Sequence, residues 1–365
     1  MPYSRCAVVT GWLVIVLASA WGPACRREAP RPTGDVAPPG DTAAAGDVEP
    51  ATAAPATPVV VYCSVDEEFS RLVFARFEKE TGVAAEVVYD SEAGKTTGLV
   101  RKIEQEASRP RADVFWSSEL FNTILLARQG LLEPYDPPAA ADIPARYRDA
   151  QHRWTAFGLR ARVLGFEPSR LPADQVPGRW EDLARPEIAP RLALANPLFG
   201  TTRGHVAAMF ALWGPERGRA WLTQVRDGKA LVVDGNTAAV RAIMDGRVDL
   251  AATDTDDVWV AQRSGSGMDL RYPDMGDGGT LLIPASVGIV KGCRHPEAAR
   301  RLVDFLVSAE VERLLGESTY RSIPVRAELR MELGLELPPE TSLSFDAVAD
   351  AMDEAVAATR DILLR

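Results

Sequence analysis

The feature that most constrains the fold is a regular alternation of short apolar runs and amphipathic segments, which begins at Val59. Residues 59–63 form a continuous β-branched and aromatic run, typical of a strand that is buried on both faces. Residues 66–81 then carry large apolar side chains at helical spacing, and Gly82 ends that predicted helix. Further predicted strands cover 83–89 and 112–116, and further predicted helices cover 96–107 and 119–128. Such alternation predicts an α/β fold with a parallel sheet covered by helices.

The same alternation returns in a second block that begins near Trp180. Its predicted strands are 192–195, 230–233 and 249–252, and a predicted helix follows each of them. Two long extended segments, 155–166 and 280–290, are interpreted as crossings between the two blocks. The chain is therefore predicted to form two lobes, each with a central sheet flanked by helices. Lobe one combines 58–155 with 273–365, which include the C-terminal helices, and lobe two comprises 156–272.

Residues 1–24 are predicted to be a secretory signal peptide. Arg5 precedes an uncharged run of small and apolar side chains over 7–20, which is short for a membrane span. The position of Cys25 after this run resembles a bacterial lipoprotein signal, in which that cysteine becomes the acylated first residue. A plain secretory signal that is cut nearby is the alternative. We therefore expect an exported protein of the periplasm or cell envelope, held to the membrane through a lipid anchor only.

The stretch that follows, residues 25–57, is rich in Ala, Pro, Thr, Gly and Asp and has no apolar periodicity. A segment of this composition buries too little apolar surface to offset the entropy lost on ordering. It is predicted to be a disordered linker between the lipid anchor and the folded lobes.

The overall charge and the cysteines limit the possible partners and crosslinks. The net charge of −10 argues against a nucleic-acid partner, which usually meets a basic surface. Cys63 and Cys293 are the two cysteines within the predicted lobes. They are predicted to be separate buried thiols, with a disulfide in the oxidising compartment as the alternative.

Polar residues follow the predicted strands of lobe one, where the carboxyl ends of parallel strands meet at one edge of a sheet. Ligand sites in open α/β sheets lie at that edge. The alternative for each residue is a helix cap, because Ser, Asp and Glu stabilise the first turn of a helix. The candidate ligand contacts in lobe one are Ser64, Glu67, Glu92, Ser117 and Ser118.

In lobe two, the segment NPLFGTTRGH precedes an apolar helix and predicts an anion site at its start. Glycine permits close backbone approach, and the amide groups at a helix N-terminus attract negative charge. An ordinary capped helix is the alternative. The candidate contacts here are Asn196, Gly200, Thr201, Thr202 and Arg203, and Asn236 follows the next predicted strand.

Three aspartates follow the last predicted strand of lobe two. Grouped carboxylates repel one another unless a cation, an ammonium group or a hydroxyl-rich ligand lies between them. Asp254 is a candidate ligand contact, and Asp256 and Asp257 are candidate metal ligands, since oxygen donors suit hard cations. One helix cap plus solvated carboxylates is the alternative.

The sequence shows no constellation typical of catalysis. Its three histidines are widely separated, and it has no nucleophile-elbow, zinc-protease or phosphate-loop motif. We expect a binding protein and no enzyme. The alternative of another class is an exported hydrolase that uses the acidic cleft, and a sensory or structural module without a permease is a third possibility.

Several segments, in this order, resemble the type II periplasmic-binding fold, and within it the ferric-iron-binding proteins of ABC importers. They are VVVYCSVDEEFSRLVFARFEKETGV, RADVFWSSELFNTILLARQGLLEPY, WTAFGLRARVLGFEPSRLP, WEDLARPEIAPRLALANP, DGNTAAVRAIMDGRVDLAATDTDD and HPEAARRLVDFLVSAEVERLL. The resemblance covers about 59–325. It implies an α/β, two-lobed, monomeric solute-binding protein that delivers its cargo to ABC permease and ATPase subunits. It implies no resident cofactor, with ferric iron or an iron–anion complex as cargo.

The sequence departs from this family at one point. The family's members bind iron through two adjacent tyrosines, and this chain has Asp256 and Asp257 in their place. Gly200, Thr201, Thr202 and Asn236 match the family's anion-binding positions. A phosphonate, a sugar phosphate or another anionic or zwitterionic organic solute is therefore the alternative cargo.

Overall fold

The computed structural model describes residues 57–90 and 97–363. The predicted signal peptide, the lipidation of Cys25, the linker up to residue 56 and the candidate contact Glu92 lie outside the described residues. Within the described ranges, no helix combines the length and apolar character that a membrane crossing requires.

The sheet of lobe one is built from three parallel strands and a long antiparallel strand. β1 (Val59–Cys63) lies between β2 (Ala85–Tyr89) and β3 (Val114–Ser117), and β10 (Leu282–Val290) pairs with β3 in the antiparallel sense. The short β4 (Leu132–Glu133) also pairs with β10. The covering helices are α1 (Glu67–Thr81), α2 (Thr97–Gln105), α3 (Phe121–Arg128), α8 (Pro296–Leu306) and α9 (Ala309–Glu317).

Lobe two also consists of a sheet covered by helices, and its sheet contains three parallel strands. β6 (Leu192–Ala195) pairs with β7 (Leu231–Val233) and β8 (Leu250–Asp254). The helices of this lobe are α4 (Gly200–Trp213), α5 (Pro215–Asp227), α6 (Asn236–Met244) and α7 (Thr255–Arg263). Helix α7 begins at the residue that follows the end of β8, so the N-terminus of this helix lies directly at the edge of the sheet.

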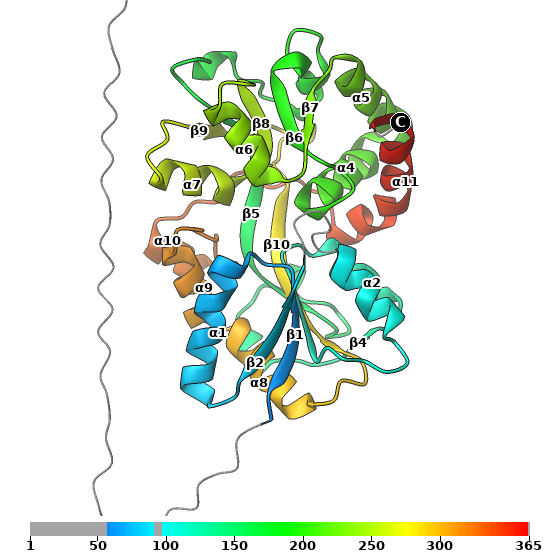
Figure 1. Cartoon of the computed structure of the whole chain (residues 1–365), viewed down its shortest axis with the longest axis vertical. Coiled ribbons are helices and arrows are strands. Elements are labelled where there is room, and N and C mark those ends of the chain that lie inside the picture. Colours follow the sequence, from blue (N-terminus) through cyan, green and yellow to red (C-terminus); the bar gives the residue numbers. More distant parts are fainter. Residues whose placement is uncertain (1–56, 91–96, 364–365) are drawn as a thin grey trace, which may run out of the picture. The chain divides into compact units, whose positions relative to one another are not determined.

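The crossing strand β5 (Thr155–Phe166) connects the two sheets (Figure 1). Its first half pairs with β10, and its residues from Arg162 onward pair with β8 and β9 (Asp269–Arg271). The strand order is therefore continuous, β2-β1-β3-β10-β5-β8-β6-β7, and all of β5 is buried. The predicted extended segments at 155–166 and 280–290 correspond to β5 and β10, and the burial of both strands explains why they are largely apolar.

Short 3₁₀ helices and two further α-helices complete the described chain. Helix α10 spans Ala327–Leu333, and α11 spans Phe345–Leu363. The 3₁₀ helices are η2 (Pro138–Ala140), η3 (Ala145–Tyr147), η4 (Ala173–Gln175), η5 (Trp180–Ala184) and η6 (Ala189–Arg191). Cys63 is buried and Cys293 is half-buried.

Helix α11 differs from the predicted lobe assignment. All of 273–365 was predicted to belong to lobe one, but α11 packs mainly against α4 and α5 of lobe two and also contacts α3 (Figure 1). The reason is that α4 is buried on nearly all sides and needs an apolar cover. At the start of α11, Asp346 and Asp350 each bind Arg128 of α3 at 2.7 Å, so this helix contacts both lobes.

We predict that the packing of α11 contributes strongly to stability. Met352 lies on the buried face of this helix with 1% of its surface exposed. Met352→Ala removes buried methylene groups and should lower the free energy of unfolding by about 2–5 kcal/mol. The exposed Glu354, on the same helix, gives the control Glu354→Ala, which should change little. Urea unfolding would measure both, and an equal effect of the two substitutions would contradict this assignment.

Candidate functional site

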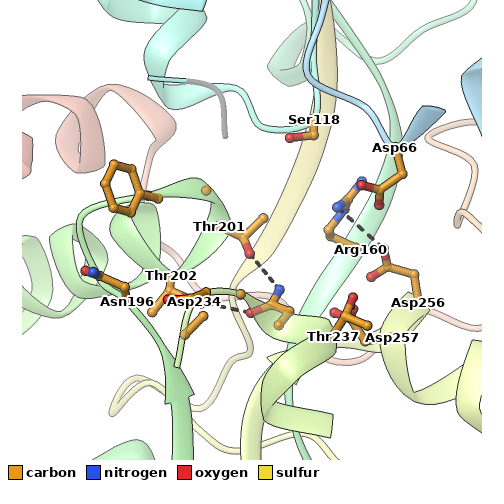
Figure 2. A pocket seen from close by; sticks show the side chains of 15 residues that line it. Asp66, Ser118, Arg160, Asn196, Thr201, Thr202, Asp234, Thr237, Asp256 and Asp257 are labelled. Atoms are coloured by element: carbon orange, nitrogen blue, oxygen red, sulfur yellow. Dashed lines mark hydrogen bonds and ion pairs between the residues drawn. The ribbon is translucent and has the colours of Figure 1, made fainter. Parts of the chain in front are cut away.

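A small polar pocket lies between the lobes, at the edge where the strands of lobe two end (Figure 2). Lobe one contributes Asp66 and Ser118, which precede α1 and α3, and the crossing strand contributes Arg160. The volume open to the centres of water molecules is about 50 Å³, which suits an ion or a small solute. The lobe-two lining residues are Ala195, Asn196, Phe199, Gly200, Thr201, Thr202, Asp234, Gly235, Asn236, Thr237, Asp256 and Asp257.

The N-termini of α4, α6 and α7 all meet this pocket, because each helix begins at the carboxyl end of a strand. The first amides of a helix have no partner within the helix and carry partial positive charge. Neither α4 nor α6 has an acidic residue in its first turn or a side-chain cap. Gly200 adopts φ +53°, and a Cβ there would meet nothing within 4 Å, so the pocket approaches the backbone of α4 closely. These two helix starts form a wall rich in backbone donors.

A buried ion pair between Arg162 and Asp254 lies beneath that wall. The two residues face each other across β5 and β8, with Arg162 Nη1 2.9 Å from Asp254 Oδ1 and both side chains fully buried. Asp254 Oδ2 accepts hydrogen bonds from Thr201 Oγ1 at 2.5 Å and from Asn236 Nδ2 at 2.7 Å. Asp254 therefore orients the side chains of two pocket residues and does not itself line the pocket, contrary to its expected role as a ligand contact.

His205 completes this buried network. Its Nδ1 accepts from Arg162 Nε at 3.4 Å, and its ring packs edge-on against Trp180. Burial and the charge of Arg162 lower the pKa of His205 well below its usual range, so the ring is neutral and able to accept that bond. This histidine belongs to the support of the site and has no contact with the pocket.

Arg160 and Asp256 form a second pair, which lines the pocket. Arg160 Nη1 lies 3.4 Å from Asp256 Oδ2, and the guanidinium lies over the ring of Tyr320 at 5.0 Å. Arg160 Nε and Asp256 Oδ1 are buried without a hydrogen-bond partner. Burial raises the pKa of Asp256 well above its usual range, an effect that Arg160 opposes and Asp257 reinforces. A ligand that supplied a donor to Asp256 would stabilise its ionised form.

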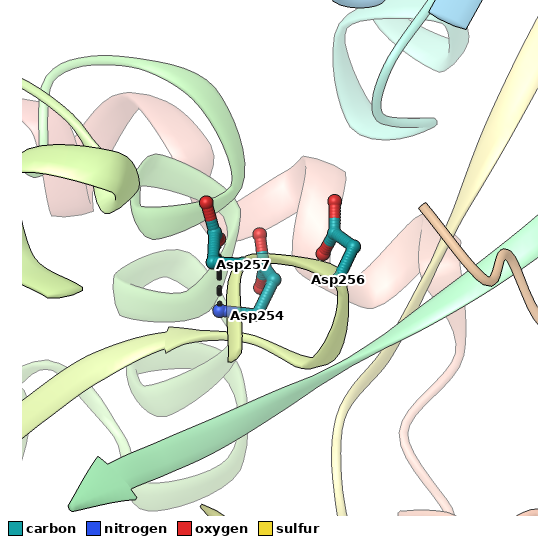
Figure 3. A group of neighbouring side chains, drawn as sticks. All are labelled: Asp254, Asp256 and Asp257. Carbon is teal, nitrogen blue, oxygen red and sulfur yellow. Dashed lines mark hydrogen bonds between the residues drawn. The ribbon is translucent and has the colours of Figure 1, made fainter. Parts of the chain in front are cut away.

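The three grouped aspartates have separate roles, although one oxygen of each lies within 4.8 Å of the others (Figure 3). Asp257 Oδ2 accepts from Thr253 Oγ1 at 2.9 Å and from the amide of Asp254 at 3.4 Å, as part of a capping box at the start of α7. Asp254 is committed to its own partners, and Arg160 lies beside Asp256. This donor set does not present three available carboxylates to a metal ion. The helix cap that the sequence analysis gave as the alternative accounts for Asp257.

The remaining predicted contacts fall into two groups. Ser118, Asn196, Gly200, Thr201, Thr202 and Asn236 line the pocket, as do Asp256 and Asp257. The others lie outside it. Ser64 Oγ accepts from the amide of Ser118 at 2.9 Å, Ser117 Oγ accepts from the amide of Glu119 at 3.3 Å, and Glu67 pairs with Arg71 on the surface of α1.

Arg203 is the predicted contact whose position differs most from expectation. Its Nη1 donates to Asn122 Oδ1 of α3 at 2.8 Å, so it bonds the start of α4 to lobe one. The next residue, Gly204, lies against the Phe121 ring so closely that a Cβ would come within 2.3 Å of it. Arg203 therefore joins the two lobes beside the pocket and does not reach into it.

The sequence reasoning missed Asp66, Arg160, Asp234 and Thr237 as pocket residues. A signal for Arg160 was present, because the otherwise apolar segment 155–166 carries Arg160 and Arg162 two residues apart. Side chains at that spacing share one face of a strand. Two cations on one face of a buried strand require anionic partners, and these are Asp254 at the end of β8 and Asp256 at the start of α7.

Comparisons with known proteins agree with the fold. A family model described as bacterial extracellular solute-binding protein matches residues 59–321. The iron uptake protein A1 of Synechocystis is 24% identical over 68% of this chain and 70% of its own length. Iron-bound HitA of Pseudomonas aeruginosa superposes with a TM-score of 0.73 at 24% identity, over 84% of this chain and 99% of HitA. AfuA of Actinobacillus pleuropneumoniae, solved with fructose-6-phosphate, gives 0.72 at 18%, over 85% and 100%. These structures confirm the predicted two-lobed type II fold.

We predict that the Arg162–Asp254 pair is essential to the stability of this site. Asp254→Asn leaves Arg162 buried without its counter-charge, which should lower the free energy of unfolding by about 3–5 kcal/mol. Glu332→Gln is the control, because Glu332 forms an exposed ion pair with Arg313 and should matter little. Chemical denaturation would measure both variants. Equal stability of Asp254→Asn and the native protein would show that the network does not depend on this charge.

Proposed function

This chain belongs to the bacterial extracellular solute-binding proteins, and we propose that it captures a small solute bearing an oxyanion between its lobes for delivery to an ABC importer. The permease and ATPase subunits of that importer are its partners in this proposal. Relatives named as periplasmic iron-binding proteins, such as that of Serratia marcescens, support an exported location. The lipid anchor at Cys25, the monomeric state and the absence of catalysis remain predictions.

The observation that carries the proposal is the convergence of the N-termini of α4 and α6 on one wall of the pocket, unopposed by acidic residues in their first turns. Backbone amides at helix N-termini bind phosphate, sulfate and carboxylate groups. The Arg162–Asp254 pair fixes the side chains of Thr201 and Asn236 in this wall. The wall therefore needs no reorganisation to receive an oxyanion, which favours binding.

The position of the pocket supports a mechanism of lobe closure. A solute in the pocket contacts lobe two at Thr202 and lobe one at Ser118, so it bridges both lobes. β5 and β10 are the strands that cross between the lobes, and a change in their bend would open or close the pocket. A ligand that touches both walls stabilises the closed arrangement, which a permease can then distinguish from the open one.

Ferric iron is the second candidate cargo, and two observations favour it. Several relatives are named as iron-binding proteins, and the carboxylates of Asp254, Asp256 and Asp257 lie close together. Against it, no tyrosine, histidine or cysteine is among the described residues that line the pocket. Tyr320 lines the adjoining recess, and its ring stacks against the guanidinium of Arg160. The geometry therefore favours an oxyanion as the bound group.

A ligand screen tests the proposed function directly. We expect phosphate, short phosphonates or carboxylates to raise the melting temperature, because a ligand at 100 times its dissociation constant stabilises the folded state by about 2.7 kcal/mol. The screen would measure thermal shifts with these anions and, separately, with ferric iron supplied as a soluble chelate. A shift with iron but with none of the anions would refute the proposal and support the second candidate.

We further predict that the hydroxyl of Thr202 contributes to anion binding. Thr202 lies in the first turn of α4 and lines the pocket, so Thr202→Val should weaken the binding of the best anion about 10- to 100-fold through the loss of one hydrogen bond to a charged group. Thr223→Val in α5 is the matched control, since Thr223 Oγ1 bonds only its own helix backbone at Arg219. Isothermal titration calorimetry would measure both. Equal weakening by the two substitutions would exclude a specific role for Thr202.

A further inference from the structure

The two sides of the interlobe pocket differ in chemical character (Figure 2). Thr201, Thr202 and Asn196 lie on one side, where the backbone donors of α4 are found and where Asp234 is the charged side chain drawn beside Thr202. Asp66, Asp256, Asp257 and Arg160 lie on the other side. Three carboxylates there face one guanidinium, so this side is formally negative. A solute that carried only negative charge would match the first side and be repelled by the second.

The carboxylate of Asp256 independently indicates that the ligand supplies a hydrogen-bond donor. Its side chain is 7% exposed and lines the pocket, yet its Oδ1 is buried without any hydrogen-bond partner. Its other oxygen, Oδ2, faces Arg160 at 3.4 Å, so that guanidinium does not satisfy Oδ1. A buried carboxylate oxygen without a donor is costly, and most such atoms in folded proteins are paired. The ligand is the natural source of the donor.

The acidic character continues beyond the pocket into a neighbouring recess. Asp66, Thr237, Asp256 and Asp257 line both spaces, so the recess opens from the negative side of the pocket. Glu67, Glu68 and Asp245 add carboxylates to its lining, Arg241 is its one basic lining residue among those described, and its volume is about 600 Å³. A positively charged group that enters from solvent therefore meets a negative potential before it reaches Asp256.

We propose that the solute is a small zwitterion, whose oxyanion binds the N-termini of α4 and α6 and whose ammonium group binds Asp256. This inference rests on the proposed function, because it names the solute class for the same pocket. Asp256 Oδ1 accepts a hydrogen bond from the ammonium group, and the carboxylates of Asp66 and Asp257 balance its charge together with that of Arg160. A primary amine carries its positive charge at neutral pH.

An ammonium group fits this side better than a metal ion does. Hard cations require several oxygen ligands in a fixed geometry, whereas an ammonium group binds through individual hydrogen bonds. Asp254 is committed to Arg162, Thr201 and Asn236, and Asp257 caps α7, which leaves too few carboxylate oxygens for a metal. Arg160 would also repel a multivalent cation at Asp256 more strongly than it repels a single charge.

Matched pairs of compounds test the inference on the native protein. Calorimetric titrations would compare 2-aminoethylphosphonate with ethylphosphonate, taurine with ethanesulfonate, and β-alanine with propionate. In at least one pair, we expect the amine to bind 10-fold or more tightly than its partner. If the amine-free anions bind as tightly as the amines, the zwitterion is refuted while the proposed function stands. If neither member of any pair binds and the other oxyanions also fail, both are refuted.

The variant Asp256→Asn tests whether Asp256 causes the preference for the amine over the amine-free anion. In this variant the amine should lose its advantage, so that both members of the pair bind within 2-fold, and the amine-free anion should bind at least as tightly as it does to the native protein, because one repelling carboxylate is removed. Retained binding of that anion shows that the variant is folded. Asp269→Asn, an exposed aspartate on β9, is the control and should keep the full preference for the amine. An unchanged preference in Asp256→Asn would refute the role of Asp256 and with it the proposed ammonium site.

Discussion

The buried ion pair between Arg162 and Asp254 is the interaction on which the architecture of the pocket depends. It lies at the point where β5 leaves the sheet of lobe one and begins to pair with β8 of lobe two. Removing two charges from water is costly, and the cost is offset only where further hydrogen bonds satisfy both groups. Thr201 of α4 and Asn236 of α6 supply such bonds to Asp254. One pair thus fixes a strand crossing and two helix starts in a single arrangement.

The crossing strand β5 carries one arginine of the buried network beneath the pocket and one arginine that lines the pocket. Arg162 points to the buried network and Arg160, two residues earlier on the same face, reaches the pocket. The pocket is therefore built around a strand that belongs to both lobes. Helix α11 adds a second link, because it covers α4 and also bonds to Arg128 of lobe one. The packing of Gly204 on Phe121 and the bond from Arg203 to Asn122 hold the lobes together beside the site.

The fold is shared with proteins solved with quite different ligands, iron in HitA and fructose-6-phosphate in AfuA. The fold therefore does not identify the cargo. The side chains at the ends of the strands determine which solute binds. Here the residues at the strand ends give one wall rich in backbone amide donors, with Asp234 beside it, and a second wall on which the carboxylates of Asp66, Asp256 and Asp257 face Arg160. This division favours a solute with separated charges.

The sequence alone determined the class of fold, the position of both crossing strands and several residues that line the pocket at the start of α4. These follow from local patterns, since apolar period, glycine stops and polar residues after strands depend on nearby positions. It did not determine which aspartate serves which purpose, nor that α11 packs on lobe two. Asp254 is a support, Asp257 a cap and Asp256 a pocket residue only because Arg162, Thr253 and Arg160 lie beside them after folding. Such partners come from distant strands, and only the tertiary structure brings them together.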